Sequence, residues 1–152
     1  MEKLSFHVKC EQFMGAFTTY AYAWNCYADV PSNPEKLVCL FDTGSDIGII
    51  NIATANRLGL YPSDELRQYE TAGGPSWSSI YKADICLPGG MVFRNRPFKG
   101  VQMPIDIMVG MDIMILGEMS LHFQEPYLEM SFTSDRYDLY LPDLCDGLGI
   151  KF

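Results

Sequence analysis

Hydrophobic and polar residues alternate in short runs along most of the chain, which is the pattern of β-strands rather than of helices. Residues 4–8 alternate, and 37–41 are apolar apart from a buryable cysteine. Further strand-like runs lie within 13–30, 47–50, 66–71, 77–87, 91–93, 98–103, 106–110, 120–123, 127–133 and 138–141. Turn-forming residues separate several of them, at 31–36, 72–76 and 88–90. The pattern predicts an all-β chain.

Two short segments have helical rather than strand character. Asn51 is a typical N-cap for a helix over residues 52–58, and Gly59 would end that helix. The apolar run 111–116 predicts a second short helix. No repeat, linker or low-complexity segment interrupts the chain, so we expect a single domain over residues 1–152.

The composition limits the kinds of partner that we expect the protein to bind. The 152 residues include 11 Lys and Arg against 19 Asp and Glu, and the formal net charge is −8. The sequence contains no basic stripe, so we expect no nucleic-acid partner. Residues 12–28 carry no charge, but this stretch contains several polar side chains and is short for a membrane span. We interpret it as part of a β-hairpin and expect no membrane association.

Cysteine usage points to a reducing environment. The chain has five cysteines, an odd number, and no two of them have the C-x-x-C spacing of a metal or redox site. The first 13 residues carry charges throughout and do not have the apolar core of a signal peptide. We therefore predict reduced thiols and a cytoplasmic location.

One polar segment lies between two apolar runs. Asp42, Thr43 and Gly44 follow the apolar run 37–41 and precede the apolar run 47–50. A carboxylate in such surroundings is unfavourable unless it is hydrogen-bonded or shares a proton. The segment is either a polar turn of common turn formers, or a catalytic aspartate presented at the tip of a buried loop.

Three segments together resemble the retropepsin-like aspartic proteases, a single-domain family of retroviral proteases and their bacterial and cellular relatives. They are Phe-Asp-Thr-Gly-Ser at 41–45, the glycine-tipped hairpin around 71–74, and Met-Val-Gly-Met-Asp at 108–112. The segment 85–88 is also similar to the return strand of the flap in bacterial members. The resemblance covers roughly residues 36–134. It implies a closed acid-protease barrel with a flap hairpin and one or two short helices.

The resemblance also implies a mechanism. Aspartic proteases activate a water between two carboxylates that share one proton, because two like charges so close together cannot both ionise. This chain has one Asp-Thr/Ser-Gly triplet, so the expected enzyme is a homodimer with one Asp42 from each copy. Asp42, Thr43 and Gly44 would be the catalytic residues, with the Thr43 hydroxyl linking the two loops. No cofactor and no metal are implied.

The remaining site residues also follow from the resemblance. Asp46 matches the position that binds the substrate backbone in retroviral members. Thr71, Ala72, Gly73 and Gly74 would form the tip of a flap that closes over a protein or peptide substrate. Val109 and Gly110 would support the catalytic loop, with Gly110 at a point where a side chain would collide.

Two positions depart from the retroviral pattern. Met111 stands where an arginine usually pairs with the carboxylate that matches Asp46, so this ion pair is expected to be missing. Trp77 lies close to the flap tip; it would either pack the flap or fill a substrate pocket, and packing is the commoner role of a large aromatic.

The leading hypothesis is an aspartic endopeptidase that hydrolyses peptide bonds as a homodimer. An alternative is a retropepsin-like module that dimerises and binds peptides without cutting them, because a fold does not fix a function. A purely structural module is a third hypothesis. The intact Asp42-Thr43-Gly44 triplet favours the enzyme, since a binding module would be free to lose it.

Overall fold

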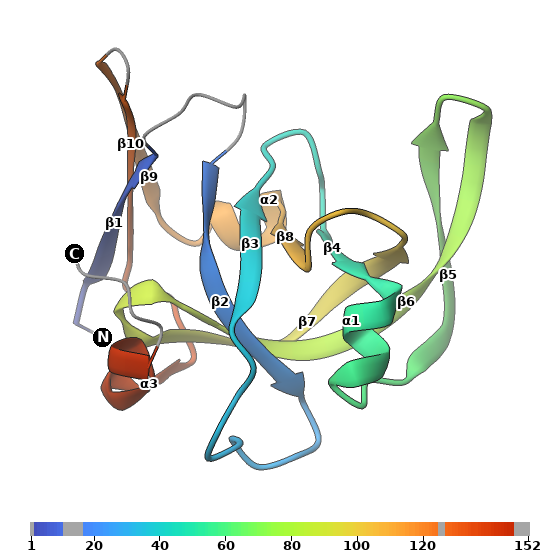
Figure 1. The fold of residues 1–152 in the computed structure, drawn as a ribbon, viewed down its shortest axis with the longest axis horizontal. Coiled ribbons are helices and arrows are strands. Elements are labelled where there is room, and N and C mark those ends of the chain that lie inside the picture. Colours follow the sequence, from blue (N-terminus) through green and yellow to red (C-terminus); the bar gives the residue numbers. More distant parts are fainter. Residues whose placement is uncertain (1, 11–16, 125–126, 148–152) are drawn as a thin grey trace.

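The computed structural model describes residues 2–10, 17–124 and 127–147, and most of these lie in β-strands (Figure 1). The larger sheet contains β2 (Phe17–Asn25), β3 (Leu37–Phe41), β4 (Gly48–Asn51), β5 (Pro62–Thr71), β6 (Gly74–Leu87), β7 (Met91–Val101), β8 (Ile107–Val109) and β11 (Leu139–Tyr140). Its order is β11-β7-β4-β8-β3-β2-β6-β5, and β6 also pairs with β7. The strands from β7 to β6 in this order therefore close into a barrel, with β5 and β11 outside it.

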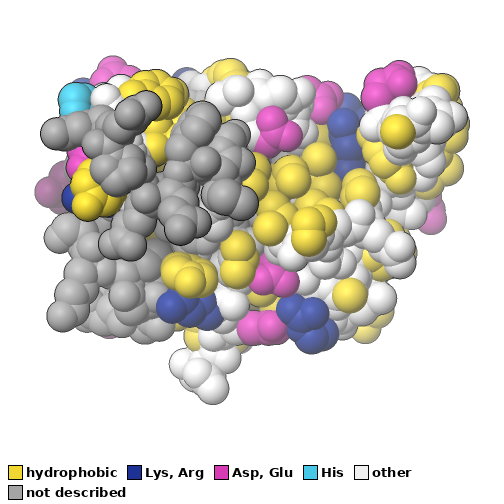
Figure 2. All heavy atoms as spheres, turned by 45° about the horizontal axis from the view of Figure 1, so that its top comes forward, with side chains coloured by type: hydrophobic (Ala, Val, Ile, Leu, Met, Phe, Trp, Pro, Cys, Tyr) yellow, Lys and Arg dark blue, Asp and Glu magenta, His cyan; other side chains and the backbone are white. Residues whose placement is uncertain are grey.

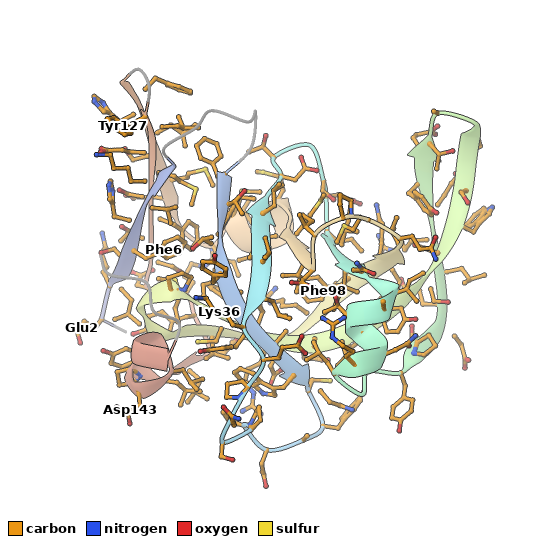
Figure 3. The ribbon with its side chains drawn as sticks, in the orientation of Figure 1. Glu2, Phe6, Lys36, Phe98, Tyr127 and Asp143 are labelled. Carbon is orange, nitrogen blue, oxygen red and sulfur yellow. The ribbon has the colours of Figure 1, made fainter. Side chains whose placement is uncertain are left out.

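A second, three-stranded sheet lies beside the barrel. It contains β1 (Leu4–Cys10), β9 (Glu118–Gln124) and β10 (Tyr127–Ser134), and β10 is the central strand. Phe6 of β1 contacts Phe132 of β10 and Phe41 of β3, with ring centroids 5.8 and 5.9 Å apart. Because these rings come from both sheets, they join the two sheets through a shared core; Figure 3 labels Phe6 there.

The core follows from the alternation of the strands. Along β3, Leu37, Cys39 and Phe41 are buried and the residues between them are half-buried. The main cluster includes Phe98, Ile50, Ile107 and Val109 from the strands around the loop of residues 42–47. This apolar packing fixes the strands that carry the loop, since burial of apolar surface is the dominant favourable term in folding.

Short helices connect or follow the strands. They are α1 (Ile52–Arg57), the 3₁₀ turn η1 (Pro88–Gly90), α2 (Met111–Met114) and α3 (Pro142–Gly147). The Asn51 side chain accepts a hydrogen bond from the Ala53 N–H, so the predicted cap of α1 is confirmed. Both helices predicted from the sequence are present as α1 and α2, and the described residues contain a third α-helix. The third lies in the C-terminal segment, where the sequence has no clear periodicity.

Most strand predictions are confirmed, with different bounds. The separate strands expected at 91–93 and 98–103 are one strand, β7, in which Asn95 adopts a positive φ of 53°. Its N–H bonds the buried carboxylate of Asp84 at 2.7 Å, which stabilises this irregular point inside the strand. Within the segment 13–30, the structure has one strand, β2. Residues 13–16 of this segment lie outside the described part of the chain.

Candidate active site

The loop of residues 42–47 connects two strands that are not neighbours. β8 lies between β3 and β4, parallel to β3 and antiparallel to β4. The N–H of Asp42 bonds the carbonyl of Val109 at the end of β8, with 3.0 Å between N and O. The Asp42 backbone is therefore held by the inserted strand, while its carboxylate remains partly exposed.

The conformation of the loop lets a backbone N–H donate a hydrogen bond to the Asp42 carboxylate. The Gly44 N–H donates to Oδ1 of Asp42 at 2.9 Å. A Cβ at position 44 would lie 3.2 Å from the same oxygen, so a glycine allows the close approach. Thr43 and Gly44 are exposed in the single chain. The structure thus brings Asp42, Thr43 and Gly44 together at an accessible surface.

Gly110 packs directly against the loop of residues 42–47. A Cβ at this position would lie 2.6 Å from both the carbonyl carbon and oxygen of Ile47, which is too close for any side chain. The next two N–H groups, of Met111 and Asp112, bond the carbonyls of Ser45 and Asp46 at 2.8 and 3.0 Å. The segment that begins α2 therefore holds the far side of the loop through its backbone.

A row of half-buried apolar side chains lies on the sheet beneath the loop. The register pairs Leu40 with Met108 and Met108 with Ile49, so their side chains share one face. Their neighbours along the strands are buried on the other face. The sequence prediction did not single out this row, although the alternation of β3 and β8 contains the signal. It forms an apolar floor next to Asp42.

The arginine pair expected to be missing is absent, but Asp46 has cationic partners from other strands. The ammonium of Lys99 on β7 hydrogen-bonds Oδ1 of Asp46 at 3.0 Å, and Arg67 of β5 lies 4.0 Å from Oδ2. The bond from Lys99 lowers the pKa of the Asp46 carboxyl below its usual value. A lysine thus takes the role of the arginine that is missing at position 111. Lys99 lies close to the loop because β7 pairs with β4, which places Lys99 opposite Ile49.

β5 and β6 form the hairpin that was predicted to be a flap, and its turn is shorter than predicted. The strands pair up to Thr71 and Gly74, so only Ala72 and Gly73 form the turn. The Thr71 hydroxyl donates to the carbonyl of Gly74 at 2.6 Å, and Gly74 has a φ of +107°. The flap projects at the same end of the molecule as the β3–β4 loop (Figure 1). Figure 2, with this end turned forward, shows hydrophobic side chains gathered beside the flap.

Trp77 is not a core residue of the flap. Its side chain is 64% exposed, so the packing interpretation is wrong. It lines a cavity of about 480 Å³ at the flap, together with Tyr69, Tyr81 and Gln102. The other tryptophan, Trp24, is buried in a second cluster of the barrel.

Within the described ranges, no group of three or more His, Cys, Asp or Glu side chains is arranged to hold a metal ion. No helix in the same residues is long and apolar enough to cross a membrane.

Comparison with solved structures defines the fold. The chain is similar to a retropepsin-like aspartic protease from Rickettsia conorii, with a TM-score of 0.58 and 17% identity over 88% of this chain and 96% of that one. A second similar structure is EIAV protease in complex with the inhibitor HBY-793, with a TM-score of 0.49 and 20% identity over 68% and 88% of the two chains. No protein-family model and no curated protein matches the sequence. The likeness to the Rickettsia protein shows that this chain has the retropepsin-like aspartic protease fold.

Proposed function

We propose that the protein is an aspartic endopeptidase whose active site is completed by a second copy of the chain. The observation that supports this most is the position of Asp42. Its carboxylate lies at the accessible tip of a loop, between two strands separated by an inserted third, and receives the Gly44 N–H. An accessible, backbone-held carboxylate of this kind is suited to general acid–base chemistry.

The proposed reaction uses two Asp42 side chains with one shared proton. The ionised carboxylate removes a proton from a bound water, which attacks the carbonyl carbon of the substrate. The protonated carboxyl gives its proton to the carbonyl oxygen, and a tetrahedral diol forms without a covalent enzyme intermediate. The carboxyl that took the water proton then gives it to the amide nitrogen as the C–N bond breaks, and the other carboxylate takes back a proton from a hydroxyl of the diol. The Gly44 N–H stabilises whichever Asp42 carboxylate is charged.

The substrate would lie extended between the flap and the apolar floor. The half-buried Leu40, Ile49 and Met108 offer contacts for apolar side chains near the cut bond. The flap tip at residues 71–74 would close over the peptide and exclude water, and Asp46 would bind its main chain. These roles fit a protein or peptide substrate.

The test is digestion of a peptide library by wild type and by Asp42→Asn. The substitution keeps the size of the side chain and removes its ability to take up a proton, so we expect cleavage to be lost at every pH. Undiminished cleavage by Asp42→Asn would remove Asp42 from the chemistry. A wild-type protein that binds library peptides without cutting them would instead support the binding-module alternative.

The location of the protein in the cell remains a prediction. Cys39 is a buried thiol in the barrel, and burial raises its pKa far above the usual value. Such a thiol is unreactive and suits a reducing compartment. On this basis we propose a cytoplasmic enzyme.

A further inference from the structure

The two faces of the β5–β6 hairpin differ in burial. The register places Arg67 opposite Ser78 and Tyr69 opposite Ser76, so these four side chains share one face. Tyr69 and Ser76 are half-buried and Ser78 is buried, whereas positions 66, 68, 70, 75 and 77 of the other face are exposed. The face that carries Arg67 is therefore the one turned toward the body of the molecule.

Arg67 lies next to the loop of residues 42–47. Its Nη1 is 4.0 Å from Oδ2 of Asp46, which is close enough for charge attraction but too far for a hydrogen bond. Figure 2 shows Lys or Arg side chains between the hydrophobic side chains and the hairpin at this end of the molecule. The Arg67 side chain is 45% exposed, so a peptide bound beside Asp46 can reach it.

The hydrogen-bonding capacity of Arg67 is mostly unused. Asp46 already accepts a hydrogen bond from Lys99 at 3.0 Å, so its charge has a closer partner than Arg67. Among the described residues, Arg67 makes one side-chain hydrogen bond, from Nε to Oε1 of Glu65 at 3.1 Å. A guanidinium has five N–H donors. The other four, on Nη1 and Nη2, are therefore left without a partner in the part of the chain that the structure describes.

The free end of the Arg67 guanidinium suits a carboxylate. Its planar fork can donate two parallel hydrogen bonds to the two oxygens of such a group. Tyr69 and Ser78, on the same face as Arg67, line the cavity of about 480 Å³ at the hairpin, which leaves room for a side chain beside it. Repulsion from Asp46 is reduced because Lys99 compensates its charge. A cationic side chain would instead meet the like charge of Arg67.

We infer that Arg67 is a specificity-determining residue that favours substrates with an Asp or Glu side chain in the segment bound beside Asp46. The carboxylate of that side chain accepts hydrogen bonds from Nη1 and Nη2 of Arg67. This inference rests on the proposed function and names the class of substrate for the same site. Because a second copy of the chain would bring a second Arg67, the acidic preference is expected at two positions, one on each side of the cut bond.

The test uses peptides with blocked termini, so that side chains carry the only carboxylates. A single Glu, or a single Gln, is moved through each position of a neutral peptide with apolar residues at its centre. We expect wild type to cleave the preferred Glu peptides with a kcat/KM roughly three- to tenfold above that of their Gln counterparts, mainly through KM. The ratio should fall as salt is added, because the contact is partly exposed.

Arg67→Gln and Gln68→Glu form a matched pair of variants. Each makes the chain more negative by one charge, and the two positions are adjacent on β5, but Gln68 lies on the exposed outer face of the hairpin. The Glu-to-Gln ratio should fall to about one in Arg67→Gln and keep its wild-type value in Gln68→Glu. Arg67→Glu should prefer Lys over Gln at the same positions. Each ratio compares two peptides on one protein, so a smaller folded fraction does not change it.

Binding of the same peptides to Asp42→Asn, followed by fluorescence anisotropy, separates recognition from cleavage. The inference is overturned if wild type shows no Glu preference at any position, if Arg67→Gln retains the preference, or if Gln68→Glu loses it equally. If wild type cleaves no peptide, the proposed function fails. The inference then stands if wild type binds Glu peptides more tightly than Gln peptides and Arg67→Gln does not, and it is overturned by any other binding result.

Discussion

Lys99 donates a hydrogen bond to the carboxylate of Asp46, with 3.0 Å between Nζ and Oδ1. The two residues are 53 positions apart in the chain, and the bond links β7 to the end of the loop of residues 42–47. The Lys99 side chain is only 11% exposed, and its cross-strand neighbours are Ile49 and Ile80. A lysine is rarely so deeply placed without an ionic partner. Asp46 therefore explains why a cation is tolerated in this part of the sheet.

Lys99→Met should remove the hydrogen bond to Asp46 and keep the packing of the aliphatic part of the side chain at position 99. The pKa of the Asp46 carboxyl is lowered first of all by the Lys99 bond, so we expect it to rise in the variant. A lowered carboxyl pKa adds stability above the unfolded pKa that is lost as the pH falls through the folded pKa. This contribution is small, because the carboxylate is 67% exposed. Carbon-detected NMR titration of Asp46 measures the change.

Lys99→Arg is the control for this experiment, since it retains the charge and should keep the pKa of Asp46 low. An unchanged Asp46 titration in Lys99→Met would mean that Arg67, 4.0 Å from the other oxygen, is the cation that matters.

The buried carboxyl of Asp112 should make the stability of the fold depend on pH in the direction opposite to that of Asp46. Both of its carboxylate oxygens are buried and have no hydrogen-bond partner among the described residues. Burial raises its pKa; the charge of Asp46 acts in the same direction, and Arg96 acts against it. A carboxyl with a raised pKa favours the folded state at low pH, and this advantage is lost as the pH rises from the unfolded pKa through the folded one.

Asp112→Asn cannot ionise, so its unfolding free energy should fall less than that of wild type between acid and neutral pH. Urea denaturation at a series of pH values provides the measurement. Asp64→Asn, on the exposed part of β5, is the control and should reproduce the wild-type slope. An identical slope in Asp112→Asn would show that Arg96 fully compensates the buried charge.

The loop of residues 42–47 could be predicted from the sequence, but its surroundings could not. Local order was sufficient to predict the strand 37–41, the Asn51 cap and the hairpin at 71–74, because strand alternation, capping and turn chemistry act over a few residues. The Lys99–Asp46 bond and the Leu40–Met108–Ile49 row could not be predicted in this way. Both depend on the insertion of β8 between β3 and β4 and on the pairing of β4 with β7, which are contacts between distant segments.

Gly110 should be one of the least replaceable residues of the chain. In Gly110→Ala the new Cβ would meet the backbone of Ile47 at 2.6 Å, and backbone yields less easily than a flexible side chain. We expect a loss of about 1–3 kcal/mol in the free energy of unfolding, as for other overpacked sites. Gly73→Ala is the matched control: its nearest neighbour would be Thr71 Oγ1 at 3.9 Å, so the change should stay within about 0.5 kcal/mol. Equal stability of the two variants, compared by urea denaturation, would contradict the tight packing at Gly110.

The flap tip should be held together by the Thr71 hydroxyl. Thr71→Val keeps the shape of the side chain and removes the 2.6 Å bond to the carbonyl of Gly74. A hydrogen bond of this kind contributes about 0.5–1.5 kcal/mol, so the amides of residues 69–74 and 76 should exchange with solvent roughly two- to tenfold faster.

Trp77 gives an independent measure of the same motion. It is 64% exposed and Trp24 is 4% exposed, so acrylamide quenching of the fluorescence reports mainly on the flap. Quenching should increase in Thr71→Val and remain unchanged in the control Ser63→Ala, which removes only the hydroxyl that accepts the Glu65 N–H near the start of β5. If both exchange and quenching match wild type in Thr71→Val, the pairing of β5 with β6 alone holds the tip.

If the flap loosens and the proposed peptidase activity is present, KM should rise more than kcat falls, because the flap contributes to holding the substrate.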